Sequence, residues 1–215
     1  MRGNLSHTAY ETILERIVCC QYAPGSMINE EQLVEELGCS RTPIRSALVR
    51  LQGEKLLKIV PKKGIVIREI SLEDIGSLYS LRELMETYAL ENFGRSMDKS
   101  KLMEYARIFK DISLHDRQGF YSYDIQFHYD IVALTNNEFL CSYFQSLQNL
   151  MRRLAWLSGS DDSQRAHDAD AEHLDIIYPW ISDSYDEALR AMHVHIRNGR
   201  EACYRVFIRR YGEKG

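Results

Sequence analysis

Proline is scarce in this sequence, with four residues among 215, and only Pro179 lies beyond residue 61. Long stretches without a helix breaker favour helical structure. No apolar run approaches the roughly 20 residues that a membrane helix needs, and the N-terminus lacks the layout of a secretory signal. Five cysteines without a Cys-x-x-Cys pair argue against a zinc ribbon or a disulfide framework. These absences predict a soluble, cytoplasmic protein with reduced cysteines and no membrane partner.

An overall excess of basic residues is also missing, since the net charge is −4. The chain is 45% hydrophobic and 27% charged, which excludes a wholly disordered protein. The charge is nevertheless uneven, because residues 41–68 contain eight basic residues and the single acid Glu54. A basic segment in an acidic protein indicates a local site for an anion such as nucleic acid. A solvated helix face is the simpler interpretation of the same segment.

The first 70 residues predict three short helices and a β-hairpin. Apolar residues recur every three or four positions over residues 10–18, which indicates an amphipathic helix. Asn29 and Gly38 suit the start and the end of a second helix, and Ser40 suits the start of a third. Two β-branched runs then flank residues 61–64, the expected tip of the hairpin.

The third predicted helix separates an apolar face from a polar face. Two helices joined by a short turn and followed by a basic hairpin are typical of a winged helix-turn-helix, which reads DNA. Arg41 and Arg45 are best suited to contact base edges, because arginine pairs well with guanine. The predicted DNA-contacting residues of the helix and the wing are Ser40, Arg41, Thr42, Arg45, Arg50, Lys62 and Lys63. One such module covers little DNA, so we expect a homodimer on a palindromic double-stranded operator.

The segment PGSMINEEQLVEELGCSRTPIRSALVRLQGEKLLKIVPKKGIVI resembles the winged helix-turn-helix of the GntR family of bacterial transcription regulators. The resemblance spans about residues 8–68, and its most specific part is the run SRTPIR that begins at Ser40. It implies that Gly64, in the wing, approaches the minor groove. Three residues depart from the family pattern: Ser46 stands in place of Glu, Val34 in place of Ala, and Lys55 in place of a helix-ending Gly.

From Ser71 onward the sequence has almost no strand signal, and apolar residues follow helical spacing. After a first helix, further helices are expected near residues 98–117, 120–135, 138–158, 162–182 and 185–211. We therefore predict a mostly α protein with two domains, a winged helix-turn-helix over residues 1–70 and an all-α antiparallel bundle of six or seven helices over residues 71–215. Arg152 and Arg153 are expected on a solvated helix face.

Four residues of the predicted bundle are candidate metal ligands: Asp124, His128, His173 and His195. Asp124 and His128 are four positions apart and therefore share a helix face. A bundle can bring two later helices to the same point, and three imidazoles with one carboxylate suit Zn²⁺, Ni²⁺, Mn²⁺ or Fe²⁺. The spacing alone is equally compatible with hydrogen-bonded or surface histidines.

Residues 71–215 resemble the FCD ligand-binding domain of the FadR-like branch of GntR regulators. The segments that carry this resemblance are LYSLRELMETYAL, DIQFH, TNNEFL, AEHLDII and EALRAMHVHI. The resemblance implies that the four candidate ligands bind a divalent transition metal in the pocket. It also implies that Arg82 binds an anionic effector and that Asn137 lies near the same pocket.

These features predict a DNA-binding transcriptional regulator, not an enzyme, whose helical domain binds a small organic acid through the metal and Arg82. Two alternatives remain at this point. The first is the same regulator with a metal-free pocket. The second is a metal-dependent hydrolase with an accessory DNA-binding domain, which would need a general base that the sequence does not identify.

Overall fold

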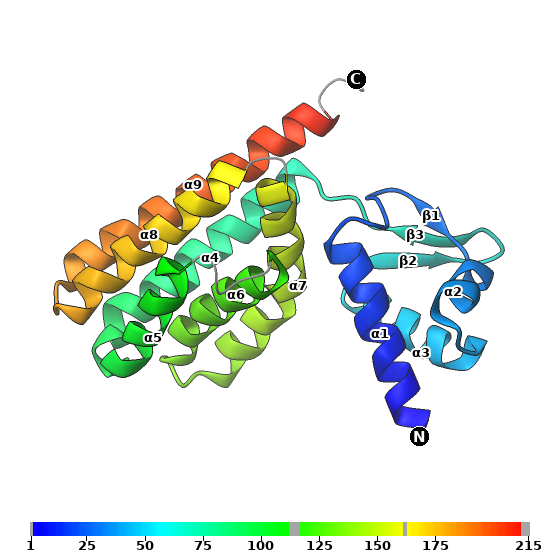
Figure 1. The fold of residues 1–215 in the computed structure, drawn as a ribbon, viewed down its shortest axis with the longest axis horizontal. Coiled ribbons are helices and arrows are strands. Elements are labelled where there is room, and N and C mark those ends of the chain that lie inside the picture. The colour runs from blue at the N-terminus through cyan, green and yellow to red at the C-terminus, as the bar shows by residue number, and fades with distance from the viewer. Residues whose placement is uncertain (1, 112–116, 161–162, 212–215) are drawn as a thin grey trace. The chain divides into compact units, whose positions relative to one another are not determined.

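The computed structural model describes residues 2–111, 117–160 and 163–211. The chain divides into two compact units, of which the first ends at Ser71 and the second begins at Leu72 (Figure 1). Within the described residues, no helix is long and apolar enough to cross a membrane.

The first unit combines three helices with a small antiparallel sheet. Its elements are α1 (Arg2–Val18), β1 (Met27–Ile28), α2 (Glu30–Leu37), α3 (Arg41–Gly53), β2 (Leu57–Val60) and β3 (Gly64–Ile67). The strand order is β1-β3-β2, so the hairpin expected from the sequence gains a third strand (Figure 1). In β1, Met27 pairs with Val66 and Ile28 pairs with Ile65. Sequence periodicity missed β1 because two residues cannot establish an alternating pattern.

The core of the first unit contains the apolar face of α3. Ile44, Ala47, Leu48 and Leu51 are buried, whereas Arg41, Thr42 and Arg45 are exposed on the same helix. This division of α3 into two faces confirms the sequence-based prediction. The residues of the core also come from α1, α2 and the sheet, among them Ile13, Ile17, Leu33 and Ile65. Each fully buried aliphatic side chain contributes about 1.5–3 kcal/mol to folding, so the core keeps the polar face of α3 on the surface.

Local capping residues determine the limits of α2. The side chain of Asn29 accepts a hydrogen bond from the backbone N–H of Gln32 at 2.8 Å, as expected for an N-cap. Gly38 follows the helix with φ +62°, a left-handed conformation that glycine adopts without strain. Both predictions are confirmed. Ser40 occupies the N-cap position of α3, but its side chain makes no capping hydrogen bond with the described residues.

The end of α3 carries backbone strain at a residue that the sequence singled out. The helix ends at Gly53, and Lys55 adopts φ +59° two residues later. A side chain with a Cβ is disfavoured in this left-handed region. Lys55 therefore occupies a position that glycine would occupy without this cost.

The second unit is entirely helical in the residues that the structure describes. Its elements are α4 (Leu72–Phe93), the short 3₁₀ helix η1 (Gly94–Ser96), α5 (Lys99–Lys110), α6 (Arg117–Ala133), α7 (Glu138–Ser160), α8 (Ser163–Ile181) and α9 (Tyr185–Tyr211). The longest helix, α9, lies beside α8 and packs against α4 (Figure 1). The mostly α fold with a helical C-terminal unit confirms the predicted fold class. The sequence extended the second helix of this unit to residue 117, but α5 ends at Lys110, and residues 112–116 lie outside the described part.

Arg153 corrects one expectation about the surface of α7. The sequence placed Arg152 and Arg153 on a solvated face, yet Arg153 is only 1% exposed. Helical spacing explains the difference, because Arg153 lies between Met151 and Leu154, which are both buried. A charged residue next to the apolar stripe of an amphipathic helix can thus be buried together with that stripe.

We expect Lys55→Gly to stabilise the first unit by up to about 1 kcal/mol, because it removes left-handed strain. Gly38→Ala is the matched control, because it adds a Cβ at a left-handed position instead of removing one. A Cβ at this position would meet no described atom within 4 Å, so the cost of about 1 kcal/mol is conformational alone. Native-state hydrogen exchange of the α2 and α3 amides measures both effects. If both variants stabilised the first unit, or both destabilised it, the strain argument would be contradicted.

Candidate metal centre and nucleic-acid interface

The structure brings together the four candidate metal ligands of the helical unit. One ligand atom from each of Asp124, His128, His173 and His195 lies within 4.8 Å of the other three. Helix α6 supplies Asp124 and His128, α8 supplies His173, and α9 supplies His195. All three imidazoles are buried. These four residues are called the ligand cluster below.

The distances within the ligand cluster match those between atoms that share one metal ion. The Nε2 atom of His128 lies 3.3 Å from Nε2 of His173 and 3.2 Å from Nε2 of His195. Oδ1 of Asp124 lies 3.1 Å from Nε2 of His173. Metal–ligand bonds of about 2.0–2.2 Å at ordinary coordination angles place neighbouring ligand atoms about 3.0–3.4 Å apart. The residues therefore fit a divalent transition metal.

Two carboxylates orient the imidazoles of the ligand cluster from outside. Nδ1 of His128 lies 2.6 Å from Oε2 of Glu86, and Nδ1 of His195 lies 2.9 Å from Oε2 of Glu172. His195 can donate its Nδ1–H outward to Glu172, which presents the lone pair of its Nε2 to the centre. Nδ1 of His128 lies at ion-pair distance from Glu86 without the geometry of a hydrogen bond. The ring of His173 instead stacks on Phe109, with ring centroids 4.2 Å apart. All three rings are thus held in orientations suited to metal binding.

Each outer carboxylate is itself held by an arginine. The Nε atom of Arg82 donates a 2.7 Å hydrogen bond to Glu86, which is fully buried. Arg165 donates two hydrogen bonds of 2.9 Å to the two oxygens of Glu172. These charge-assisted bonds keep both carboxylates ionised and in place.

The electrostatics of the site favour neutral imidazoles and ionised carboxylates. Burial lowers the pKa of His128, and it lowers the pKa of His195 to about 3. Burial would raise the pKa of Glu86, but the charge of Arg82 beside it contributes most to lowering it to about 2. The pKa of Asp124 also lies well below its ordinary value, because the hydrogen bond with His173 and the nearby charges outweigh burial. Neutral nitrogen donors and one carboxylate are the forms that bind a metal.

Arg82 and Asn137, the two expected effector residues, have different environments. Arg82 is buried, and its Nη2 atom has no hydrogen-bond partner among the described residues. A buried guanidinium nitrogen without a partner suits an anionic ligand. Asn137 is exposed, and its side-chain oxygen accepts hydrogen bonds from the backbone N–H groups of Phe139 and Leu140. Asn137 thus caps α7, which accounts for this residue without an effector.

The expected DNA-contacting residues lie on the surface of the first unit. Ser40, Arg41, Thr42 and Arg45 are exposed at the start of α3, and Lys62 and Lys63 are exposed at the tip of the hairpin. Gly64 has φ +127°, and a Cβ built there would lie 2.8 Å from the backbone oxygen of Ile28. The contact between β1 and β3 therefore requires glycine at this position, whether or not DNA is bound.

The arginines of α3 already pair with carboxylates within the first unit. Arg41 pairs with Glu31, and Arg45 pairs with Glu30, both at 3.0 Å. Arg50 lies over the ring of Tyr10, 3.5 Å from its centroid, and also pairs with Glu54. Arg50 therefore has a structural role that competes with the expected DNA contact.

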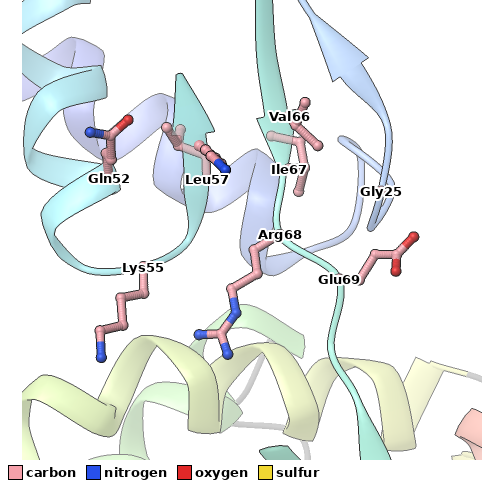
Figure 2. A pocket seen from close by; sticks show the side chains of 9 residues that line it. Gly25, Gln52, Lys55, Leu57, Val66, Ile67, Arg68 and Glu69 are labelled. Atoms are coloured by element: carbon pink, nitrogen blue, oxygen red, sulfur yellow. The ribbon is translucent and has the colours of Figure 1, made fainter. Parts of the chain in front are cut away.

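A second basic feature of the first unit was not predicted from the sequence. A groove of about 620 Å³ is lined by Gln52, Lys55, Lys58, Arg68 and Glu69, among others. Figure 2 shows the side chains that line it. The lining residues come from the end of α3, the start of β2, the end of β3 and the segments next to them. The groove thus lies at the end of the hairpin opposite to Lys62 and Lys63 and is separate from the expected DNA-contacting residues.

Two family models match this arrangement of units. Residues 5–67 match the bacterial regulatory proteins of the gntR family, and residues 77–198 match the FCD domain. The chain belongs to the GntR family. This membership confirms the resemblance seen in the sequence.

Similar proteins support the assignment of this GntR-family chain over most of its length. It is 30% identical over 149 residues to the gluconate operon transcriptional repressor of Bacillus licheniformis, a match that covers 66% of the chain and 60% of the repressor. It is 29% identical over 187 residues to the Nta operon transcriptional regulator of Aminobacter aminovorans, which covers 84% and 85%. A solved structure of a GntR-type putative transcriptional regulator from Rhodococcus sp. RHA1 has the same fold, with a TM-score of 0.77 and 20% identity over 93% of this chain and 97% of that one. The protein is a transcriptional regulator with a GntR helix-turn-helix and an FCD domain.

Sequence reasoning about this GntR regulator missed the outer carboxylates Glu86 and Glu172. Glu86 lies four positions after Arg82, so the i,i+4 rule could have predicted their ion pair. The contacts of Glu86 with His128 and of Glu172 with His195 join different helices and have no local signal. Helical spacing cannot reveal such pairs.

We expect the purified protein to bind about one transition-metal ion per chain and His173→Ala to lose it, because the variant removes one of four ligands. His193→Ala is the matched control, since His193 is exposed and pairs with Glu83 outside the ligand cluster. Elemental analysis after purification without chelator measures the metal content of both variants. Competition with a chromophoric chelator then measures their metal affinity. Retention of the metal by His173→Ala would contradict the assignment of this ligand.

Proposed function

We propose that this regulator acts as a homodimer that binds a palindromic DNA operator, and that its FCD domain binds a small carboxylate through a divalent metal. In this proposal residues 1–70 form the DNA-binding domain, and residues 71–215 form the effector-binding and dimerisation domain. The convergence of three buried Nε2 atoms and one carboxylate oxygen is the observation that carries the metal-dependent part.

The chemistry of the ligand cluster supports a bound cation. With Nδ1 of His128 and of His195 facing Glu86 and Glu172, the lone pairs of their Nε2 atoms face each other at 3.2 Å. Two lone pairs at this distance repel each other unless a proton or a cation lies between them. A low pKa disfavours the proton, so a metal ion is the better partner. The donor set of three nitrogens and one oxygen suits Zn²⁺, Ni²⁺, Mn²⁺ or Fe²⁺.

The charges around the ligand cluster support an anionic effector. Glu86 balances the charge of Arg82. Without a metal, the ionised Asp124 therefore gives this part of the interior a net charge of −1. A divalent ion brings it to +1, which favours a carboxylate and supplies it with a Lewis acid. The free Nη2 atom of Arg82 offers a hydrogen bond to the same ligand. We therefore expect the metal to bind first and the carboxylate second.

The relatives support the class of effector. One of them is named for a gluconate operon, and gluconate is a small hydroxycarboxylate. A carboxylate with a neighbouring hydroxyl can contact both a metal and a guanidinium group. Binding changes operator affinity only if the effector prefers one of two states of the protein, with a coupling of about 1–3 kcal/mol.

Sensing accounts for the site better than hydrolysis does. Hydrolysis needs a general base, such as a carboxylate, that is free to accept a proton from water. Glu86 and Glu172 are occupied by imidazoles and arginines. Asp130, on the same helix as His128, accepts hydrogen bonds from Tyr105 and Gln126. These contacts give each of the three carboxylates a structural partner in place of a reacting water.

We expect Arg82→Lys to keep its positive charge and the metal but to weaken carboxylate binding about tenfold, because lysine lacks the planar fork of arginine. Thermal stabilisation of the zinc-loaded protein by gluconate, citrate and succinate measures the affinity. Arg95→Lys, at an exposed position of the same unit, is the control. Equal stabilisation of wild type and Arg82→Lys would remove Arg82 from the effector site, and equal stabilisation with and without zinc would favour a metal-free pocket.

For the DNA interface, we expect Arg45→Ala to lower specific affinity by about 1–3 kcal/mol and to relax one operator position. Lys63→Ala should weaken binding to all duplexes and flatten the salt dependence, because a phosphate contact carries no sequence information. Fluorescence anisotropy with a duplex selected from a randomised pool, at several salt concentrations, distinguishes the two effects. Unchanged binding by Arg45→Ala would show that α3 is not the reading helix.

A further inference from the structure

Two acidic residues lie beside the arginines expected to read DNA. Glu30 and Glu31 form the first turn of α2, directly after the N-cap Asn29. Each of them pairs with one arginine of α3: Glu30 with Arg45, and Glu31 with Arg41. Acidic side chains at this surface repel DNA phosphates, so their presence at the expected interface needs an explanation.

The two glutamates contact different nitrogen atoms of their arginines. Both oxygens of Glu30 accept a hydrogen bond from Nε of Arg45, at 3.1 and 3.0 Å. This arrangement leaves the two terminal nitrogens of Arg45 available, and an arginine needs two parallel N–H groups to read guanine. Glu31 instead accepts from Nη2 of Arg41, at 3.0 Å, and so occupies one of the terminal nitrogens.

The two glutamates also differ in how firmly the fold holds them. The side chain of Glu30 is 30% exposed, whereas that of Glu31 is 77% exposed. The turn that carries them is fixed by the Asn29 cap and by Leu33, which is fully buried. Glu30 is therefore a partly enclosed acceptor on a rigid element, and Glu31 is a solvated one.

We propose that Glu30 is a positioning residue that presents Arg45 for base reading, and that Glu31 only weakens the attraction of Arg41 for any anion. The inference rests on the proposed role of Arg45 at the DNA interface. Glu30 raises specific affinity because it orients the guanidinium before DNA arrives. It also lowers affinity for random DNA through its charge. Together these effects increase the discrimination between the operator and other sequences.

The size of the effect follows from the cost of ordering an arginine. Immobilising a long side chain at an interface costs about 0.5–1.5 kcal/mol, which corresponds to roughly a twofold to tenfold change in affinity. Exposed ion pairs contribute little to folding stability. Removal of Glu30 therefore acts on recognition far more than on stability.

The test measures a positional binding profile with the full-length protein. A duplex selected by the wild-type protein from a randomised pool, its single-base variants and a scrambled duplex of equal length serve as probes. We expect Glu30→Ala to reduce discrimination at one position about twofold to tenfold and to raise affinity for the scrambled duplex. Glu30→Gln, which keeps an acceptor for the Nε–H of Arg45, should retain more discrimination than Glu30→Ala.

Glu31→Ala is the matched control, because it removes one acid from the same helix turn. We expect it to raise affinity for the selected and the scrambled duplexes by the same factor, so that discrimination stays constant. In the Arg45→Ala background, Glu30→Ala should no longer change the profile. Thermal unfolding of each variant verifies that the first unit is intact.

The outcomes separate this inference from the proposed function. If Arg45→Ala relaxes one position but Glu30→Ala does not, the positioning role of Glu30 is wrong and the DNA interface stands. The positioning role would also be wrong if Glu30→Ala reduced discrimination equally in the wild-type and Arg45→Ala backgrounds. The effect of Glu30 would then not depend on Arg45. If Arg45→Ala changes nothing, both the interface and the inference are wrong.

Discussion

The helical unit depends on a set of charges that have been removed from water. Arg82, Glu86 and His128 form one buried chain, and Arg165, Glu172 and His195 form a second, partly buried one. Removing such charges from water costs several kcal/mol per ion unless each one is paired and hydrogen-bonded. Every charged group of the two chains has an ionic partner, and the chains join α4 to α6 and α8 to α9, although Nη2 of Arg82 has no hydrogen-bond partner among the described residues. The geometry of the ligand cluster is therefore a consequence of ion pairing outside it.

This dependence explains why the imidazoles can be both buried and ready for a cation. Burial alone would only neutralise them, and neutral histidines could rotate or exchange tautomers. The carboxylates of Glu86 and Glu172 fix two of the rings, and the aromatic face of Phe109 fixes the third. In the first unit, an exposed pair between Glu30 and Arg45 holds a side chain in the same manner but at much lower cost.

Local signals made much of this protein predictable from its sequence. Asn29 and Gly38 act on their own helix ends, and the two faces of α3 follow from spacing alone, so each could be predicted without knowledge of the fold. The fold class was predictable for the same reason. Asp124 and His128 could be paired by their spacing of four, whereas His173 and His195 were candidates without a sequence-local partner until the family resemblance supported them.

The remaining features depend on contacts between distant parts of the chain. Glu86 contacts His128 across two helices, and β1 exists only because β3 offers it a partner. Arg153 is buried although the sequence predicted a solvated face, and Asn137, whose expected place near the pocket came from the family resemblance, caps α7. Periodicity reports which face of a helix is apolar, but it does not report which polar groups meet inside.

The separation of the ligands along the chain has a consequence for folding kinetics. His128 lies 45 positions before His173 and 67 positions before His195, so the ligand cluster is complete only after three helices have met. Contacts between such distant residues form late, after the entropy of closing long loops has been lost. An ion that binds the finished cluster stabilises the native state more than the transition state. It therefore prolongs the life of the folded domain by slowing unfolding, with little effect on how fast the chain folds.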